Sequence, residues 1–532
     1  MGIFTKKSFI FIYGPPGSGK STIGKQLANS LGLPFCDLDD EIELVTGKEI
    51  IEIFQIQGEA KFRDIETKVL KNLLLGSPKV IALGGGSLCD PQNRSLVENY
   101  GQVVCLYANH DILCARLKTS KKQRPLLGST NEINSRLSAL LERRQDHYSS
   151  FTHILDNSNL SIEETTWQIQ IILGLFVIRG LTEDCHINIK YNGLSSLGEQ
   201  LRSHGWTDRI IVVSDSNVAP IYSAEISSIL EKSGFHIAQE TFPAGEKSKT
   251  PQNCSEMWNR WLGLGIDRSS GVIALGGGVV CDQVGFAAST YMRGIHWAAI
   301  PTSLLAIVDA SIGGKTGINL SQVKNLIGSF HPPAVVIADP SVLGSLPVDE
   351  LRNGMAEIVK SAIIADPYLF NLCDSRISGL QFQNFDSNLW MEVIKRAIAV
   401  KVHFVQIDPL DKDQREVLNL GHTLGHALEK ASDFRLRHGE AIAIGLVCEA
   451  CLSVKKKIAD EDLPNKIRTI LDQLGLPSTI PDFIDRDYLV DSIRYDKKAK
   501  NGKIIFSLPI RIGEVKIGVV IDHDDLKFLE EV

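Results

Sequence analysis

The sequence lacks any run of the ~18–20 consecutive apolar residues that a membrane-spanning helix needs. It also has no excess of positive charge, because 56 lysines and arginines stand against 63 aspartates and glutamates, a formal net charge of −7. A chain of this charge is not expected to bind nucleic acid or an anionic membrane surface. Basic residues that serve anionic ligands must therefore be concentrated at particular sites.

Paired cysteine spacings and a secretory signal are missing as well. Most of the ten cysteines lie within apolar runs, and the one CxxC, Cys448 to Cys451, lies in a helical apolar pattern that predicts a core position. The short apolar run at residues 9–13 has no cleavage site and leads directly into a glycine-rich loop. These features predict a protein of the reducing cytoplasm.

No linker rich in glycine, serine or proline divides the 532 residues, although this length predicts two or more domains. A helical pattern after Ser161 ends near residue 174, and a new strand pattern begins at Glu183. We therefore place a domain boundary between residues 174 and 182.

The segment GPPGSGKST at residues 14–22 follows a strand pattern and precedes an amphipathic helical pattern that extends from Thr22 to Leu31. It fits the P-loop motif GxxxxGK[ST], in which backbone N–H groups and a helix N-terminus surround phosphates. Lys20 is expected to reach the β- and γ-phosphates of ATP and Ser21 to hold Mg²⁺. The predicted nucleotide-binding residues are Gly14, Gly17, Gly19, Lys20, Ser21 and Thr22.

Charged and glycine-rich segments follow this loop. Residues 33–39 predict a second strand, with Asp37 and Asp39 on one face at its carboxyl end. Residues 80–83 predict a third strand that ends in three glycines, where backbone can approach a small ligand. Arginines in later helical and lid-like segments are expected to clamp a carboxylate and stabilise transferred charge; they are Arg63, Arg124, Arg143 and Arg144.

Residues 1–174 together resemble shikimate kinase. The resemblance implies a P-loop kinase fold, a parallel sheet with helices on both faces, and ATP- and Mg²⁺-dependent phosphorylation of shikimate. It implies that Asp39 acts as the base near the 3-hydroxyl, that Asp37 supports Mg²⁺ through water, and that Arg124 is the lid arginine touching the transferred phosphoryl group. The implied shikimate-binding residues are Asp39, Arg63, Gly85, Gly86 and Arg144.

Strand patterns in the second half, at residues 209–215 and 271–275, predict another α/β sheet. The second pattern ends in Gly276 to Gly278, and a glycine turn at the carboxyl end of a strand lets a pyrophosphate lie against backbone N–H groups. The spacing is not GxGxxG, so alone it is a weak nucleotide signal. Further polar residues after strands strengthen it, namely Asp215, Asn217, Glu246, Lys249 and Asp282.

The segment VIALGGGVVCD at residues 272–282 nearly repeats VIALGGGSLCD at residues 80–90. A duplication would predict a second P-loop, and no such motif precedes residue 272. We interpret the two segments as strand and glycine-turn units that solve a similar packing problem.

Three of the thirteen histidines lie between Arg415 and Glu440. His422 and His426 are four residues apart in a helical pattern and so share a face, and His438 opens a second apolar helical run. Imidazole is a common ligand of divalent metals, so this cluster predicts a metal site that needs one more protein ligand. Glu357 and Lys360, one helical turn apart upstream, offer a carboxylate and an ammonium group. Spacing alone does not choose between His422 and His426.

Lysines and arginines recur in glycine-rich or apolar contexts in this half of the chain, as Arg293, Lys315, Lys324 and Lys360. In a protein of net negative charge, cations of this kind beside a metal predict a phosphorylated, carboxylated sugar acid as substrate.

Residues 182–532 closely resemble 3-dehydroquinate synthase. The resemblance implies an α/β NAD-binding domain, residues 182–340, and a mainly helical metal- and substrate-binding domain, residues 341–532. It implies conversion of 3-deoxy-D-arabino-heptulosonate 7-phosphate to 3-dehydroquinate and phosphate, with NAD restored in every turnover. Zinc, with cobalt as an alternative, would be held by Glu357, His422 and His438. Lys315, His426 and Arg415 would act in catalysis.

The resemblance also implies the remaining ligands. NAD would lie along Asp215, Asn217, Glu246, Lys249, Gly277, Gly278, Asp282, Thr302 and Ser303. The heptulosonate phosphate would be held by Arg293, Asp309, Lys315, Lys324, Asn325, Lys360, Lys401, Arg415, Asn419, His426 and Lys498, with Lys497 as an alternative to Lys498. Arg293 would reach in from the partner in a homodimer formed through this half.

The sequence therefore predicts a bifunctional enzyme of the shikimate pathway that acts on small molecules. A metal-dependent polyol dehydrogenase is an alternative for the second half, but it leaves Lys315, Lys324 and Arg415 without a phosphate or carboxylate to bind. A nucleotide-sensing module is an alternative for the first half, although a sensor has no need of the acceptor residues Asp39 and Arg63.

Overall fold

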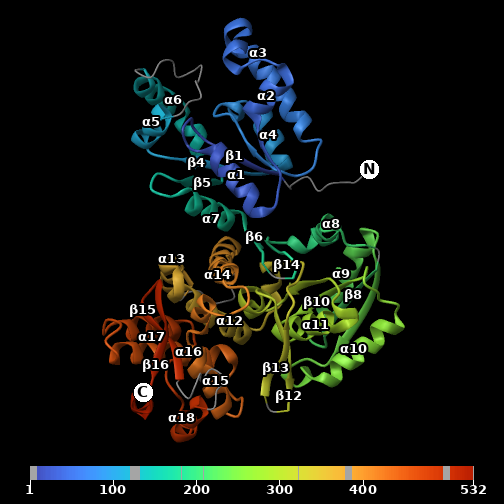
Figure 1. The fold of residues 1–532 in the computed structure, drawn as a ribbon, viewed down its shortest axis with the longest axis vertical. Coiled ribbons are helices and arrows are strands. Elements are labelled where there is room, and N and C mark those ends of the chain that lie inside the picture. Colours follow the sequence, from blue (N-terminus) through green and yellow to red (C-terminus); the bar gives the residue numbers. More distant parts are fainter. Residues whose placement is uncertain are drawn as a thin grey trace. The chain divides into compact units, whose positions relative to one another are not determined.

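The computed structural model describes residues 9–119, 132–180, 182–207, 209–321, 323–377, 386–494 and 504–530. It divides into two compact units, Met1–Val177 and Ile178–Val532 (Figure 1). Arg124, Lys497 and Lys498, which the sequence places in binding sites, lie outside the described residues. In the described ranges, no helix combines the length and the apolar character needed to cross a membrane.

The first unit contains a parallel five-stranded sheet in the order β2-β3-β1-β4-β5. Its strands are β1 (Phe9–Tyr13), β2 (Phe35–Asp37), β3 (Val80–Ala82), β4 (Gly101–Tyr107) and β5 (His153–Asp156). The connecting helices are α1 (Lys20–Leu31), α2 (Leu38–Thr46), α3 (Ile50–Leu73), α4 (Pro91–Tyr100), α5 (His110–Thr119), α6 (Ile133–Ser149) and α7 (Ile162–Leu173).

Both faces of this sheet are buried, because successive side chains of the central strand β1 enter different cores. Phe11 and Tyr13 pack in one core together with Phe62 of α3, whereas Ile10 and Ile12 pack in another. A strand with alternate side chains in two cores needs helices on both sides of the sheet. The predicted kinase-like fold is therefore confirmed.

The second strand differs from the prediction. Strand β2 ends at Asp37, and α2 begins at Leu38, so Asp39 lies in the first turn of a helix rather than on a strand. The Asp37 side chain caps α2 by accepting from the Asp39 N–H at 3.0 Å. Acidic side chains are favoured at a helix start, where N–H groups lack partners, and this explains why the strand stops early.

A seven-stranded sheet in the order β6-β7-β14-β11-β10-β8-β9 belongs to the second unit except for the start of β6, because the division between the units follows Val177 within that strand. Its strands are β6 (Leu175–Ile178), β7 (Cys185–Ile189), β8 (Arg209–Asp215), β9 (His236–Phe242), β10 (Gly271–Gly276), β11 (Trp297–Pro301) and β14 (Val335–Ala338). Its helices include α8 (Leu197–Ser203), α9 (Ala219–Lys232), α10 (Pro251–Gly263) and α11 (Gly278–Thr290). A separate antiparallel hairpin joins β12 (Lys315–Leu320) to β13 (Val323–Phe330).

The rest of the second unit is mainly helical, as predicted. Its helices are α12 (Val348–Ala365), α13 (Pro367–Leu372), α14 (Ser387–Ile407), α15 (His422–Ala431), α16 (His438–Lys455), α17 (Leu463–Gln473), α18 (Arg486–Arg494) and α19 (His523–Leu526). One antiparallel hairpin, β15 (Ile504–Arg511) with β16 (Glu514–Ile521), completes it. Helix α16 packs against both α12 and α15, which brings the metal-ligand candidates of three separate segments together.

Candidate functional sites

The loop at residues 14–19 turns sharply between β1 and α1. Gly14, Gly17 and Gly19 have φ angles of 135°, 83° and 90°, a region that side-chain-bearing residues rarely adopt. Lys20, which is 8% exposed, curls back so that its ammonium donates to the carbonyl oxygens of Gly14 at 3.0 Å and Pro15 at 2.9 Å. The glycines therefore permit a loop that holds the lysine ammonium beside its own backbone.

Ser21 and Asp37, the two residues assigned to Mg²⁺, meet in the structure. The Ser21 hydroxyl donates to Asp37 Oδ2 at 2.5 Å, although the residues are sixteen positions apart. A hydroxyl and a carboxylate are oxygen ligands of the kind that Mg²⁺ prefers, so the pair fits a magnesium ion held at the end of the P-loop.

The predicted acceptor residues converge on the glycines that follow β3. A Cβ atom built on Gly86 would lie 2.6 Å from Arg63 Nη2 and 3.1 Å from Arg144 Nη2, and one built on Gly84 would lie 3.3 Å from Asp39 Oδ1. Arg144 also donates to the Gly85 carbonyl at 2.9 Å. Two cations and one carboxylate thus surround a stretch of bare backbone, an arrangement suited to a small hydroxylated carboxylic acid.

Sequence reasoning missed Glu66, which supports this site. Glu66 is fully buried, accepts from Arg63 Nη1 at 2.6 Å and also accepts from the Ser87 hydroxyl. Its position three residues after Arg63 in α3 is the spacing of helical neighbours, so this partner was available from the sequence.

Glu357, His422 and His438 form a cluster whose candidate ligand atoms all lie within 4.8 Å of one another. The Nε2 atoms of His422 and His438 each lie 3.5 Å from the same oxygen, Glu357 Oε1. Glu357 is 1% exposed, and this oxygen has no hydrogen-bond partner among the described residues. Two imidazole nitrogens facing one orphaned carboxylate oxygen are a donor set that fits zinc.

The Nδ1 atoms of His422 and His438, which point away from Glu357, each face an oxygen acceptor. His422 Nδ1 lies 3.1 Å from the Leu420 carbonyl, which can only accept, so Nδ1 donates there and Nε2 is the nitrogen that faces Glu357. His438 Nδ1 lies 3.6 Å from Glu429 Oε2. His426 is grouped differently, with Glu429 and His438. The structure therefore places His422 with Glu357 and leaves His426 beside the cluster.

Charge at this cluster is balanced by burial and by neighbouring cations. Burial opposes ionisation of Glu357, but the Lys360 ammonium and the His438 imidazole lower the pKa of this carboxyl to about 2. Burial likewise opposes ionisation of Glu429, and His438 and Lys324 lower its pKa to about 2. The neighbouring cations therefore favour the charged form of both carboxyl groups.

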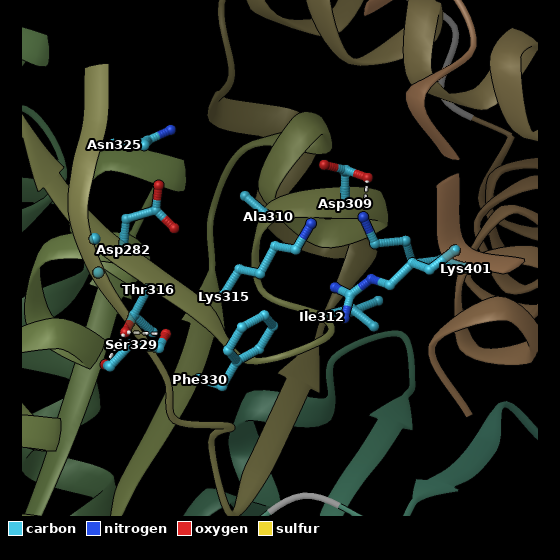
Figure 2. Close-up of a pocket in the computed structure, with 13 residues that line it drawn as sticks. Asp282, Asp309, Ala310, Ile312, Lys315, Thr316, Asn325, Ser329, Phe330 and Lys401 are labelled. Carbon is cyan, nitrogen blue, oxygen red and sulfur yellow. Dashed lines mark hydrogen bonds and ion pairs between the residues drawn. The ribbon is translucent and has the colours of Figure 1, made fainter. Parts of the chain in front are cut away.

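A cavity of about 360 Å³ lies between the helical part and the residues that the sequence assigns to NAD, here called the NAD-side residues (Figure 2). The predicted site residues that line it are Asp282, Asp309, Lys315, Asn325, Lys401 and Arg415. Three of these six carry positive charge, so the cavity suits an anionic ligand. This grouping joins residues from five separate stretches of the sequence.

Two lysines that line the cavity, Lys401 and Lys315, each pair with a carboxylate. Lys401 donates to Asp309 Oδ1 at 2.6 Å, as Figure 2 shows, and Lys360 Nζ lies 3.9 Å from the same oxygen. Burial opposes ionisation of Asp309, but both lysines outweigh it and lower the pKa of this carboxyl. Lys315 pairs with Asp411, a second residue that sequence reasoning missed.

Arg415 is 2% exposed and donates to the carbonyl oxygens of Gly313 at 3.3 Å and Pro409 at 3.0 Å. The Asp408 carboxylate holds the loop before it by accepting the N–H groups of residues 412, 413 and 415. A buried guanidinium fixed by its own loop presents a preorganised planar face to a carboxylate or phosphate.

The NAD-side residues gather at the carboxyl ends of β8, β10 and β11. Lys249 donates to Asp282 Oδ2 and to Asn325 Oδ1, each at 2.5 Å. Gly277 caps α11, and a Cβ atom built on it would lie 3.4 Å from Ser303 Oγ. Thr302 precedes Ser303 immediately after β11. The helix N-terminus, with bare backbone around it, fits a pyrophosphate.

Several predicted residues lie in this region without lining the cavity. Asp215 caps its own loop through the Asn217 N–H at 2.8 Å, and Glu246 accepts from Asn319 at 2.7 Å. Asn419 ends the turn Gln414–Asn419, and two residues separate it from the start of α15. Arg293 is exposed and has a φ of 70°.

Comparison with known proteins gives one family for each unit. A family model described as shikimate kinase matches residues 16–173. Models described as 3-dehydroquinate synthase N-terminal and 3-dehydroquinate synthase C-terminal match residues 239–353 and 354–499.

A curated 3-dehydroquinate synthase of Rippkaea orientalis is 40% identical over 343 residues, which span 64% of this chain and 94% of the relative. Among solved structures, ValA, a 2-epi-5-epi-valiolone synthase from Streptomyces hygroscopicus with NAD⁺ and Zn²⁺ bound, is 26% identical with a TM-score of 0.61 over 66% of this chain and 97% of ValA. A 2-deoxy-scyllo-inosose synthase complexed with carbaglucose-6-phosphate, NAD⁺ and Co²⁺ shares the fold, with 24% identity and a TM-score of 0.61 over 67% of this chain and 99% of that protein.

These relationships agree with the two sites and support catalysis in the first half rather than nucleotide sensing alone. Over its second unit the chain belongs to the 3-dehydroquinate synthase family, and with the shikimate kinase domain of its first unit it is a bifunctional enzyme of the shikimate pathway.

Proposed function

We propose that the residues gathered in each unit carry out its reaction in the roles that follow. The observation that carries the synthase assignment is the convergence of Glu357, His422 and His438 beside a cavity lined by cations. The observation that supports the kinase assignment is the meeting of Arg63 and Arg144 over Gly86, next to Asp39 and the P-loop.

In the kinase unit, ATP binds with Mg²⁺ along the P-loop. Lys20 neutralises the β- and γ-phosphates, and Ser21 and Asp37 hold the ion. Arg63 and Arg144 bind the shikimate carboxylate, and Asp39 orients the attacking hydroxyl and accepts its proton. Arg124 remains the proposed lid arginine.

In the synthase unit, Glu357, His422 and His438 hold a divalent metal, zinc or cobalt. The bound metal supplies Lewis acidity at a substrate hydroxyl, and bound NAD supplies a hydride acceptor that is regenerated. NAD lies along Gly277 and Gly278, with the other residues of its set at the strand ends; these are Asp215, Asn217, Glu246, Lys249, Asp282, Thr302 and Ser303.

The side chains of the synthase cavity bind and orient the heptulosonate phosphate. Arg415 and Lys401 bind its carboxylate, because both are buried cations already fixed by their neighbours. The phosphate group of the substrate is bound by a second set of residues, Lys315, Asn325, Asn419 and His426. Lys360 and Asp309 supply a positive and a negative charge between the metal ligands and the residues that bind the substrate carboxylate. Lys498 completes the site.

The fused chain forms a homodimer through its synthase unit, with Arg293 of one protomer reaching the other site. The exposure of Arg293 and its left-handed backbone support this arrangement. A cytoplasmic location is supported by seven of the ten cysteines, which are buried as free thiols. Domain limits of 1–174, 182–340 and 341–532 complete the proposal.

One pair of assays tests both assignments on the intact chain. Inorganic phosphate should be released from the heptulosonate phosphate only when NAD and zinc or cobalt are present. Shikimate should become phosphorylated when ATP and Mg²⁺ are supplied, whether or not NAD is added. Phosphate release that persists after metal chelation and NAD removal would contradict the synthase assignment.

A further inference from the structure

Glu429 lies outside every set of residues assigned above, and its two oxygens face different elements. It lies on α15 and is 5% exposed. Glu429 Oε2 is 3.6 Å from Nδ1 of His438 on α16, and Glu429 Oε1 accepts from Lys324 Nζ of β13 at 3.0 Å. A buried carboxylate is costly without such partners, so its presence needs an explanation.

The contact with His438 determines which of its nitrogens can bind a metal. His438 Nε2 faces Glu357 Oε1 at 3.5 Å, and Nδ1 faces Glu429. The 3.6 Å separation is longer than a hydrogen bond, but a carboxylate on the Nδ1 side favours a proton there, which leaves the Nε2 lone pair for the metal and orients the ring. Glu429 therefore lies on the Nδ1 side of the His438 ring, as the Leu420 carbonyl lies on the Nδ1 side of the His422 ring.

The contact with Lys324 connects this carboxylate to the β12–β13 hairpin. The Lys324 ammonium also lies 4.5 Å from the centre of the Phe434 ring, so it is held from two sides. The next residue, Asn325, lines the cavity and accepts from Lys249, which in turn pairs with Asp282. A continuous series of contacts therefore connects His438 to the NAD-side residues: Glu429 contacts Lys324, and the adjacent residue Asn325 contacts Lys249.

We propose that Glu429 is a positioning residue that fixes His438 as a metal ligand and ties it, through Lys324, to the hairpin beside the NAD site. The inference rests on the proposed metal site. Glu429 touches neither the substrate nor the metal in this role, and acts through His438 and Lys324. It couples metal retention to cofactor binding.

A second interpretation of the same geometry is that Glu429 is itself a ligand. Glu429, His426 and His438 offer ligand atoms within 4.8 Å of one another. A metal there would share His438 with the first cluster and would lie close to the Lys324 ammonium that pairs with Glu429. We favour the positioning role because Glu429 already pairs with the Lys324 ammonium, and metal stoichiometry separates the two interpretations.

The test uses the full chain with three substitutions, His438→Ala as a reference without the proposed ligand, and zinc as the probe. Glu429→Gln keeps the size of the side chain and an acceptor oxygen but removes the charge, and it should weaken zinc binding by ~10–100-fold in chelator competition. The same variant should raise the KM for NAD in the synthase assay. Lys324→Met should raise that KM while its zinc affinity stays within about threefold of the parent, because His438 keeps its carboxylate.

Glu240→Gln is the matched control. Glu240 is also a buried carboxylate of the second unit, 6% exposed, but it pairs with Trp261 and Arg260, away from the metal cluster. This variant should keep the parental zinc affinity. Thermal melting of all three variants shows whether a loss of zinc follows from unfolding of the unit.

The outcomes are distinct. Parental zinc affinity in folded Glu429→Gln would overturn the inference, as would weakening of the same size in Glu240→Gln. Two zinc ions per chain, one of them lost in Glu429→Gln, would make Glu429 a ligand and overturn the positioning role. His438→Ala that retains its zinc would overturn the proposed metal site itself, whereas zinc lost there but unchanged in Glu429→Gln defeats only this inference.

Discussion

The segments at residues 80–90 and 272–282 share their first seven residues, VIALGGG, yet continue differently. After β3, the chain of the kinase unit makes one short turn, Ser87–Cys89, and starts α4 only at Pro91. After β10, the chain of the synthase unit starts α11 at once, at Gly278. The same strand and glycines thus precede an open loop in one unit and a helix N-terminus in the other.

The residue after the shared aspartate explains the difference. Pro91 follows Asp90, and the residue before a proline disfavours the helical region, so a helix that continues through Asp90 is disfavoured. Asp90 instead caps α4 by accepting from the Gln92 N–H at 2.7 Å, with proline in the first turn. Gln283 follows Asp282 and lets the helix continue, so the Asp282 carboxylate pairs with Lys249.

The equivalent glycines therefore face different neighbours. A Cβ atom on Gly86 would meet Arg63 and Arg144, whereas one on Gly278 would meet Ala310 at 3.2 Å. In the kinase unit the glycine turn leaves room for the two guanidinium groups that we propose bind the substrate. In the synthase unit the glycine turn permits close packing against Ala310 and leaves the N-terminus of α11 without a side-chain cap. Identical local sequence can serve two binding tasks because the following residues set the backbone path.

The largest expected effect separates the two units. Lys20→Ala removes the cation at the transferring phosphates, and kinase activity should fall by ~10³–10⁵-fold while synthase activity is unchanged. Lys25→Ala, on the exposed face of α1, is the matched control and should keep both activities. Coupled assays of both reactions on one preparation measure this. A parallel fall of synthase activity would show that the units are not independent.

Loss of the metal should have the next largest effect, in the other unit. His438→Ala should lose zinc and ~10³-fold of synthase turnover, since Lewis-acid stabilisation is worth several kcal/mol. His426→Ala should keep its zinc and lose turnover. Metal analysis after dialysis, with kinase activity as the internal reference, distinguishes them. Zinc kept without His422 and lost without His426 would reverse the ligand choice.

A matched pair of glycine substitutions probes the packing difference directly. An added Cβ on Gly276 would lie 2.4 Å from Val280 Cγ2 in a buried, apolar site, so Gly276→Ala should destabilise the synthase unit by ~1–3 kcal/mol. The equivalent Gly84→Ala would meet Ser87 Oγ at 2.9 Å and Glu66 Oε1 at 3.0 Å. It should raise the KM for shikimate with a smaller change in melting. An equal loss of unfolding free energy in both variants would contradict the proposal that Gly276 serves packing and Gly84 serves the substrate site.

The smallest effect concerns the shared aspartates. Asp90→Ala removes a helix cap and should cost ~0.5–2 kcal/mol of kinase-unit stability, without change in synthase kinetics. Asp282→Ala removes the partner of Lys249 rather than a cap, so it should raise the KM for NAD. Chemical denaturation and synthase kinetics of the two variants test this. A cap-like loss of stability without a KM change in Asp282→Ala would contradict the assignment.

Features that depend on neighbours in the chain followed from the sequence alone. The P-loop, the strand before it and the helical spacing of His422 and His426 are local, because glycine, proline and apolar periodicity act over a few residues. Recognition of both families, the α/β class of both units and the mainly helical C-terminal part followed from such motifs.

Contacts between distant segments were decided only by the tertiary structure. Spacing did not choose between His422 and His426, and the packing of α16 against α12 and α15 placed His422 with Glu357. The early end of β2 moved Asp39 onto a helix, because a side-chain cap outweighed strand pattern. Glu429 stayed unnoticed since a glutamate in an amphipathic helix normally faces solvent. Only the approach of α16 and β13 buries it between His438 and Lys324.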